Sequence, residues 1–255
     1  MRKPIIAGNW KMNLRIIEAI RLAQSVRVAL DGFSHAEVVL CPPFTSLFAV
    51  SQVLKGSSLA LGGQNCYPEK SGAFTGEISP MMLLDIGCTW TILGHSERRH
   101  ILGETNRFIN EKVRFALQAG LQVMLCIGET LEEREKGVMD SVLREQVYEG
   151  LREVPAEWLS RLVIAYEPVW AIGTGVNATP SQAEEAHQFV RSLVSELYGD
   201  DVAQQIRIQY GGSVKPQNAR ELFEQPNVDG FLVGGASLSA EQFVPIVKVA
   251  ETVAR

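Results

Sequence analysis

The stretch Leu162-Val163-Ile164-Ala165-Tyr166-Glu167-Pro168 is a short apolar run that ends in a carboxylate and a proline. An apolar run of this length, bounded by such a breaker, predicts a buried strand. Proline ends the strand because it cannot continue the hydrogen-bonded ladder. Glu167 is therefore expected at the rim, where the chain leaves the apolar interior.

Seven similar runs occur elsewhere in the 255 residues, and longer stretches of helical pattern separate them. This alternation is typical of a parallel sheet whose strands are linked by crossover helices. The predicted strands are 5–7, 37–40, 59–61, 91–93, 122–127, 162–166, 206–210 and 230–233. Eight parallel strands can close into a barrel, so we predict an α/β fold, a (β/α)8 barrel with outer helices, in which residues 1–255 form one domain. A doubly wound open sheet is the less favoured alternative.

Start and stop signals delimit several of the predicted helices. Ser79-Pro80 precedes 81–86, Thr105 precedes 106–119 and Ser239 precedes 240–250. Serine and threonine favour the position before a helix, and proline favours its first turn. Gly120 supplies a stop after the second of these helices.

Composition excludes several classes of function. Hydrophobic residues make up 46% and charged residues 21%, which is usual for a folded globular protein. The net charge of −5, with no long basic run, argues against nucleic acid and anionic membranes as partners. The apolar run 5–7 is too short for a signal peptide core or a membrane span, so we expect a cytoplasmic protein.

The cysteines and histidines do not suggest a metal site or a cofactor. Cys41, Cys66, Cys88 and Cys126 are widely spaced and are expected to be reduced packing groups. The histidines other than His95, which are His35, His100 and His187, have no HExxH spacing, so no metal is predicted. No GxGxxG motif follows the first strand, which leaves a nicotinamide cofactor without support, and no cofactor is predicted.

Glu167 and His95 follow two different strands and are expected on one rim, since side chains at the carboxyl ends of barrel strands converge. Glu167 is a candidate general base, because an apolar site would raise the pKa of its carboxyl. His95 precedes a predicted helix whose dipole would keep the imidazole neutral, ready to polarise a carbonyl. The alternative interpretations are that Glu167 is a solvated glutamate and that His95 is a structural histidine.

Lys11 and Asn9 follow the first strand, where a cation and an amide could stabilise a negative oxygen. Two glycine pairs follow the last two strands, in Gly211-Gly212-Ser213 and Gly234-Gly235. Backbone N–H groups free of side chains can approach an anion there, at the usual phosphate position of such barrels. Each pair alone could be a tight turn, but together they favour a phosphate site.

Six motifs in order along the chain resemble one family closely. They are GNWKMN at 8–13, GAFTGE at 72–77, GHSERR at 94–99, AYEPVWAIGTG at 165–175, YGGSV at 210–214 and GGASL at 234–238. The chain resembles the triose-phosphate isomerases. That family serves as the general example of pairing a glutamate base with a neutral histidine.

The resemblance implies an intramolecular aldose-ketose isomerase of glycolysis and gluconeogenesis. Glu167 would carry a proton between neighbouring carbons of dihydroxyacetone phosphate and D-glyceraldehyde 3-phosphate, while His95 and Lys11 stabilise the enediolate. Asn9 and Lys11 match substrate-contacting positions, and Glu97 matches a further acidic catalytic position. The phosphate-binding positions of the family match Gly173, Ser213, Gly234 and Gly235.

Two loops carry further implications of the resemblance. Residues 168–178 match a lid that closes over the phosphate, and closure would protect the enediolate from water. Val176-Asn177 stand where Lys-Thr is usual, which puts the lid's hinge in question. The loop around Thr75 matches the segment that the family inserts into a partner subunit, which implies a homodimer.

Two rival functions remain open at this point. A Schiff-base aldolase on the same type of barrel would use Lys11 as its nucleophile. A sensor that binds phosphosugars would keep Gly211, Ser213 and Gly234 without needing a base.

Overall fold

A computed structural model describes residues 2–171 and 178–253. Its strands are β1 (Ile5–Asn9), β2 (Glu37–Cys41), β3 (Ala60–Gly63), β4 (Trp90–Leu93), β5 (Gln122–Ile127), β6 (Leu162–Tyr166), β7 (Arg207–Tyr210) and β8 (Gly230–Val233). Each strand pairs in parallel with the next, and β8 pairs with β1 to close the barrel. The predicted (β/α)8 fold is confirmed, and the open-sheet alternative is wrong.

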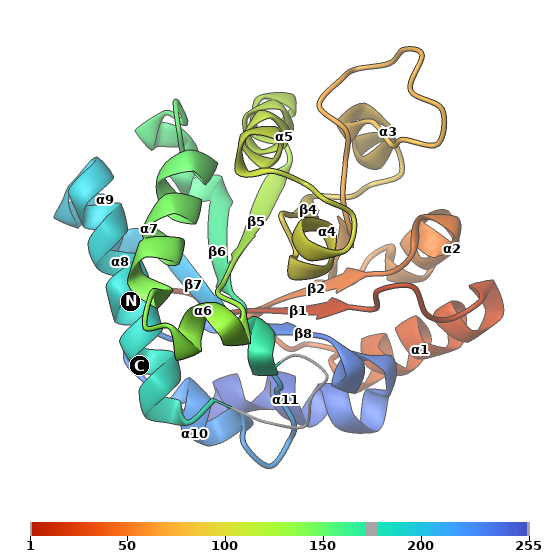
Figure 1. The fold of residues 1–255 in the computed structure, drawn as a ribbon. Coiled ribbons are helices and arrows are strands. Elements are labelled where there is room, and N and C mark those ends of the chain that lie inside the picture. Colours follow the sequence, from red (N-terminus) through yellow and green to blue (C-terminus); the bar gives the residue numbers. More distant parts are fainter. Residues whose placement is uncertain (1, 172–177, 254–255) are drawn as a thin grey trace.

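Helices surround the barrel, as Figure 1 shows. The α-helices are α1 (Ile16–Ala29), α2 (Phe44–Leu54), α3 (Pro80–Asp85), α4 (Ser96–His100), α5 (Asn106–Ala119), α6 (Leu131–Glu135), α7 (Met139–Gly150), α8 (Pro180–Tyr198), α9 (Asp200–Gln205), α10 (Ala219–Phe223) and α11 (Ala240–Thr252). Short 3-10 helices cover Ala156–Arg161, Val169–Ala171 and Gly235–Leu238. None of the helices in the described ranges is long and apolar enough to cross a membrane.

The predicted helix signals are found at two of the three helices and in part at the third. The Ser79 hydroxyl accepts the N–H of Met81, and the Thr105 hydroxyl accepts the N–H of Phe108. Gly120 ends α5 with a φ of 106°, a left-handed conformation that glycine adopts without strain. Ser239 precedes α11 without a capping bond from its side chain.

Three strands, β5, β6 and β8, match the predicted bounds, and ends of the other five differ by one or two residues. The largest difference is at β1 and β3, which run two residues further than predicted, to Asn9 and Gly63. Asn9 is included because it pairs with Cys41 of β2, and Gly63 because it pairs with Thr91 of β4. These pairings depend on neighbouring strands and leave no mark in the local apolar pattern.

Alternation along the strands separates the barrel interior from the layer under the helices. Val163 and Ala165 of β6 belong to the inner cluster, whereas Ile164 and Tyr166 pack in the outer one. Because side chains alternate with a period of two, Glu167 continues the inward series of β6. Asn9 likewise continues the inward series of β1. All four cysteines are buried and free, as expected.

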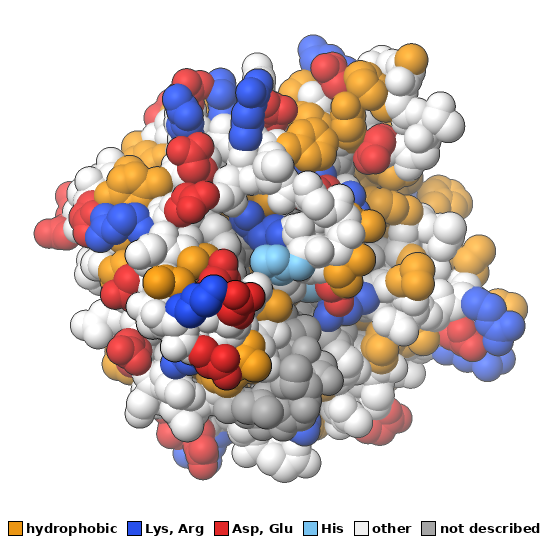
Figure 2. Space-filling model, viewed as in Figure 1, with side chains coloured by type: hydrophobic (Ala, Val, Ile, Leu, Met, Phe, Trp, Pro, Cys, Tyr) orange, Lys and Arg blue, Asp and Glu red, His pale blue; other side chains and the backbone are white. Residues whose placement is uncertain are grey.

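Exposed large hydrophobic side chains gather on segments that follow β1 to β4. They include Met12, Phe44, Phe48, Phe74, Met81, Met82, Ile101 and Leu102. Figure 2 shows hydrophobic side chains on the side of the molecule where α2 and α3 lie. The loop between β3 and α3, which contains Thr75, projects from the same side in Figure 1. Clustering of this kind marks a surface that is suited to contact another protein.

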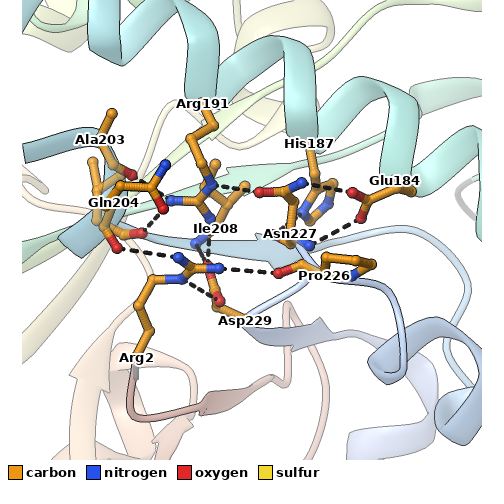
Figure 3. Close-up of polar contacts among 11 residues, drawn as sticks. Arg2, Glu184, His187, Arg191, Ala203, Gln204, Ile208, Pro226, Asn227 and Asp229 are labelled. Atoms are coloured by element: carbon orange, nitrogen blue, oxygen red, sulfur yellow. Dashed lines mark hydrogen bonds and ion pairs between the residues drawn. The ribbon is translucent and has the colours of Figure 1, made fainter. Parts of the chain in front are cut away.

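At the other end of the strands, a polar network joins the chain's beginning to α8 and β8 (Figure 3). The buried Asp229 carboxylate accepts Arg2 Nε at 2.7 Å and Arg191 Nη2 at 2.8 Å. It also accepts the backbone N–H of Ile208 in β7 at 2.9 Å. Paired charges and satisfied hydrogen bonds make this buried carboxylate tolerable at the barrel's base.

Candidate active site

Glu167 and His95 meet at the carboxyl ends of β6 and β4. The Nε2 atom of His95 lies 2.9 Å from Oε1 of Glu167, and both side chains are almost fully buried. The other carboxylate oxygen accepts the backbone N–H of Ser96, at the start of α4, at 2.9 Å. The structure thus brings together the two residues that the sequence placed on one rim.

The hydrogen bonds of His95 indicate how its ring is oriented. Its Nδ1 atom accepts the backbone N–H of Glu97 at 3.2 Å, since His95 is the residue that precedes α4. An Nδ1 that accepts a bond carries no proton in the neutral ring, so the proton lies on Nε2. The neutral imidazole would then donate from Nε2, to Glu167 in this arrangement.

Contact between the two groups shifts both pKa values. Burial raises the pKa of Glu167, but the neighbouring His95 and the N–H of Ser96 outweigh burial and hold it below its usual value. Burial lowers the pKa of His95, but the Glu167 carboxylate outweighs it and raises the pKa. Both directions are opposite to those expected, because the sequence pattern revealed the burial and the helix but not this contact.

Lys11 and Asn9 form the next part of the site. Lys11 has a φ of 51°, a strained conformation for a residue other than glycine. The side chain of Asn9 accepts the N–H of Lys11 at 3.0 Å, and Gln64 Nε2 donates to the Lys11 carbonyl at 2.8 Å. Gln64 also donates to the carbonyl of Cys41 at 2.9 Å. The backbone of the lysine is therefore held from both sides.

Glu97 lies beside Lys11 and His95. Its carboxylate is 2.8 Å from Lys11 Nζ and 3.5 Å from His95 Nδ1. The Glu97 side chain is 44% exposed, so the ion pair lies at the edge of the site. A carboxylate here neutralises part of the charge of Lys11.

A cavity of about 520 Å³ joins the predicted residues. Its lining includes Asn9, Lys11, His95 and Glu167, together with Ser213, Gly234 and Gly235. A Cβ added to Gly234 would lie 3.5 Å from Cε of Lys11, so the glycine pair after β8 and the lysine side chain are adjacent. Phosphate held at the glycines would therefore face a cation.

Gly211 and Gly212 permit close approach between β7 and the residues after β6. A Cβ on Gly211 would lie 2.8 Å from Cγ of Glu167, and one on Gly212 would lie 2.3 Å from the hydroxyl of Tyr210. Both distances are shorter than side chains tolerate. Gly211 consequently leaves room for the Glu167 side chain, and Gly212 leaves room for the Tyr210 hydroxyl.

Glu129 forms hydrogen bonds with residues at the beginning of the predicted lid. Its Oε1 accepts the hydroxyl of Tyr166 at 3.0 Å, the indole N–H of Trp170 at 2.8 Å and Arg134 at 3.0 Å. Gly173 and the segment Val176-Asn177 lie outside the described residues.

Among the residues that are described, no group of His, Cys, Asp and Glu side chains is placed to hold a metal ion.

Sequence reasoning missed the residues that support the site. Glu129 lies in the IGET segment after β5, and Gln64 in the GGQN segment after β3, so their positions at strand ends were the available signal. Among their partners, Trp170 is 41 residues from Glu129 along the chain, and Lys11 is 53 residues from Gln64. Such contacts arise from barrel closure and cannot be read from local spacing.

Comparison with known proteins agrees with the fold and the motifs. The family model described as "Triosephosphate isomerase" matches residues 4–250. The triosephosphate isomerase of Chlorobium phaeobacteroides is 56% identical over 251 residues, which are 98% of this chain and 100% of the relative. That of Carboxydothermus hydrogenoformans is 54% identical over 97% of this chain and 99% of the relative. The chain belongs to the triosephosphate isomerase family.

Proposed function

We propose that the chain interconverts dihydroxyacetone phosphate and D-glyceraldehyde 3-phosphate through an enediolate, in glycolysis and gluconeogenesis. The observation that carries the proposal is the cavity that joins Glu167, His95 and Lys11 to the glycines after β7 and β8. A base, a hydrogen-bond donor, a cation and a phosphate position are the groups that this proton transfer needs. Membership of the family supports the same reaction.

In this mechanism, Ser213, Gly234 and Gly235 bind the phosphate, with Gly173 as a further contact. His95 donates from Nε2 to the substrate carbonyl, and Lys11 balances the negative charge that develops on the oxygen. Glu167 removes a proton from the adjacent carbon and returns it to the neighbouring one. Asn9 contacts the substrate and holds the backbone of Lys11 through its side-chain oxygen.

Glu167 has to exchange its partners before it can act as a base. In the structure its two oxygens contact Nε2 of His95 and the N–H of Ser96. Substrate would take over the Nε2–H of His95, which releases one carboxylate oxygen. Loss of the contact with His95 in a buried site would raise the pKa of Glu167 toward that of a useful base.

Glu97 supports the site by positioning Lys11. Its ion pair with Lys11 holds the ammonium in place until the substrate's negative charge arrives. The same ion pair disfavours the aldolase reading, since an ammonium group held by a carboxylate is a poor nucleophile for a Schiff base.

We also propose a homodimer in the cytoplasm. The projecting loop around Thr75 and the exposed hydrophobic side chains after β1 to β4 share one side of the molecule, next to the strand ends that carry Asn9 and Lys11. Burying that surface against a second copy would remove apolar area from water. Sedimentation of the purified chain over a range of concentrations would measure the assembly.

A coupled assay of the purified protein with D-glyceraldehyde 3-phosphate tests the reaction. In deuterated water, we expect deuterium in the product and no cleavage between carbons. Covalent trapping at Lys11 by borohydride would instead support the aldolase, and tight binding without turnover would support the sensor. Glu167→Asp is expected to lower kcat by orders of magnitude with a modest change in KM, because it misplaces the base by about 1 Å.

A further inference from the structure

Arg99 connects the ends of two strands beneath the proposed catalytic groups. It lies on α4, four residues after His95, and its Nε donates to the carbonyl of Gly94 at 2.7 Å. Its Nη2 donates to the carbonyl of Cys126 in β5 at 3.0 Å, and its Nη1 donates to Asn106 at the start of α5. One guanidinium therefore fixes the end of β4, the end of β5 and the next helix.

The first carbonyl belongs to the residue directly before His95. Gly94 has a φ of 71°, a conformation that favours glycine, and a Cβ there would lie 3.0 Å from the Nη2 of Arg99. The guanidinium consequently occupies the space beside the backbone turn from which the His95 side chain projects. Moving it would free the turn to rotate.

The second carbonyl lies close to the backbone of Glu167. Cys126 precedes Ile127, whose carbonyl accepts the N–H of Glu167 at 2.7 Å. The same stretch continues to Gly128, where a Cβ would lie only 1.7 Å from the Glu167 carbonyl. A shift of β5 at Cys126 would therefore be passed to the residue that carries the base.

The charge of Arg99 is not neutralised by direct contact. Arg98, its neighbour, forms an ion pair with Glu104 at 2.6 Å, whereas Arg99 has no carboxylate within ion-pair distance among the described residues. Burial lowers the pKa of Arg99, and the neighbouring Cys126 and Glu167 oppose this lowering only in part. A guanidinium stays charged at all working pH values.

We infer that Arg99 is a positioning residue for the isomerisation: its fork of donors fixes His95 and Glu167 relative to each other, and its charge favours negative charge in the site. This inference rests on the proposed function. Arginine suits both tasks, because its planar group can bond two carbonyls in fixed directions while it remains a cation. Lysine would keep the charge but lose the fork.

Arg99→Met and Arg99→Lys separate the two contributions. The Met variant is expected to lose about 10- to 100-fold in kcat with a smaller change in KM, since a misplaced base acts on bound substrate. The acidic limb of its pH profile of kcat/KM should also move to higher pH. The reason is that Glu167 loses a nearby positive charge, which raises the pKa of its carboxyl. The Lys variant should restore this acidic limb while kcat stays below that of the wild type.

Arg161→Met is the matched control. Arg161 Nη1 donates to the carbonyl of Leu117 at 2.8 Å, on another part of the chain, and it lines no part of the cavity. This variant should keep the wild-type kcat and pH profile even if its melting temperature falls. The wild type is assayed first, so inactivity of the wild type would refute the proposed function and not the role of Arg99.

An active wild type makes the outcomes for Arg99 decisive. A Met variant with a lowered melting temperature but an unchanged kcat and acidic limb would overturn the inference, as would a loss confined to KM. If the Met variant does not fold, Arg99→Lys decides alone. Reduced kcat with the acidic limb in place would support the inference, and wild-type kcat would overturn it.

Discussion

Nε2 of His95 lies 2.9 Å from Oε1 of Glu167, so the proposed base and the proposed hydrogen-bond donor are partners of each other. Each stabilises the charged form of the other, which explains why the pKa of Glu167 is lowered and that of His95 is raised despite their burial. Substrate must compete with this contact. The two groups therefore titrate as a pair until a ligand separates them.

Removing the charge of Glu167 should lower the pKa of His95. In Glu167→Gln, burial and the nearby Lys11 still disfavour the imidazolium, but the carboxylate that outweighed them is gone. Titration of the imidazole nitrogens by NMR would measure the change, with the exposed His100 as internal reference. An unchanged titration of His95 would show that the two side chains do not interact in solution.

The pair should also make stability depend on pH in a defined window. The folded pKa of His95 lies above the unfolded value of 6.5. Its contribution to the free energy of unfolding is therefore fully present below pH 6.5 and is lost as the pH rises through the folded value. The folded pKa of Glu167 lies below the unfolded value of 4.5, so its contribution is present above pH 4.5 and is lost as the pH falls through the folded value.

These two directions place the largest contribution of the pair between pH 4.5 and 6.5. Urea unfolding of the wild type and of Glu167→Gln, measured across this range and above it, would test the prediction. The advantage of the wild type, relative to the variant, should decline above the window. A difference in unfolding free energy that is constant with pH would contradict it.

How much of the site the sequence could predict follows from the range of each interaction. Glu167 and His95 were predictable as neighbours, because each directly follows an apolar run and parallel strands bring such ends together. Their hydrogen bond, and the bond from Ser96 to Glu167, were not, since both depend on side-chain directions between residues 71 or more apart. The same holds for Gln64, whose donors reach two other strand ends.

Gln64→Glu should impair both binding and catalysis. The variant keeps the shape of the side chain but replaces the donors that hold the carbonyls of Lys11 and Cys41. Since Lys11 is in a strained conformation, losing its support should misplace the ammonium, and kcat/KM should fall by roughly 100-fold. Steady-state kinetics would measure this. Gln52→Glu, on the exposed face of α2, is the control and should behave as the wild type.

Gly211→Ala should lower kcat without a comparable effect on KM. The added Cβ would lie 2.8 Å from Cγ of Glu167, so the side chain of the base has to move. Gly235→Ala is the matched comparison, because its Cβ would meet no protein atom within 4 Å. That variant should act mainly on KM and on inhibition by inorganic phosphate. Equal changes in kcat for both variants would argue against crowding of Glu167 as the cause.

Asp229→Asn should be the most destabilising of these changes and the least harmful to chemistry. The carboxylate is fully buried between Arg2 and Arg191 (Figure 3), so neutralising it leaves two cations without their shared partner. Breaking a buried ion pair from one side costs about 3–5 kcal/mol. Arg2→Ala should cost less, because the Arg2 side chain is 19% exposed and water can replace part of its contacts.

Urea unfolding of Asp229→Asn, Arg2→Ala and the double variant would measure these costs and the coupling between the two residues. Because Asp229 lies before β8, at the end of the barrel away from Glu167, the kcat of protein that remains folded should match that of the wild type. An Asp229→Asn variant with wild-type stability would mean that the arginines find other partners. A lowered kcat in fully folded protein would mean instead that the barrel's base and the proposed active site are coupled.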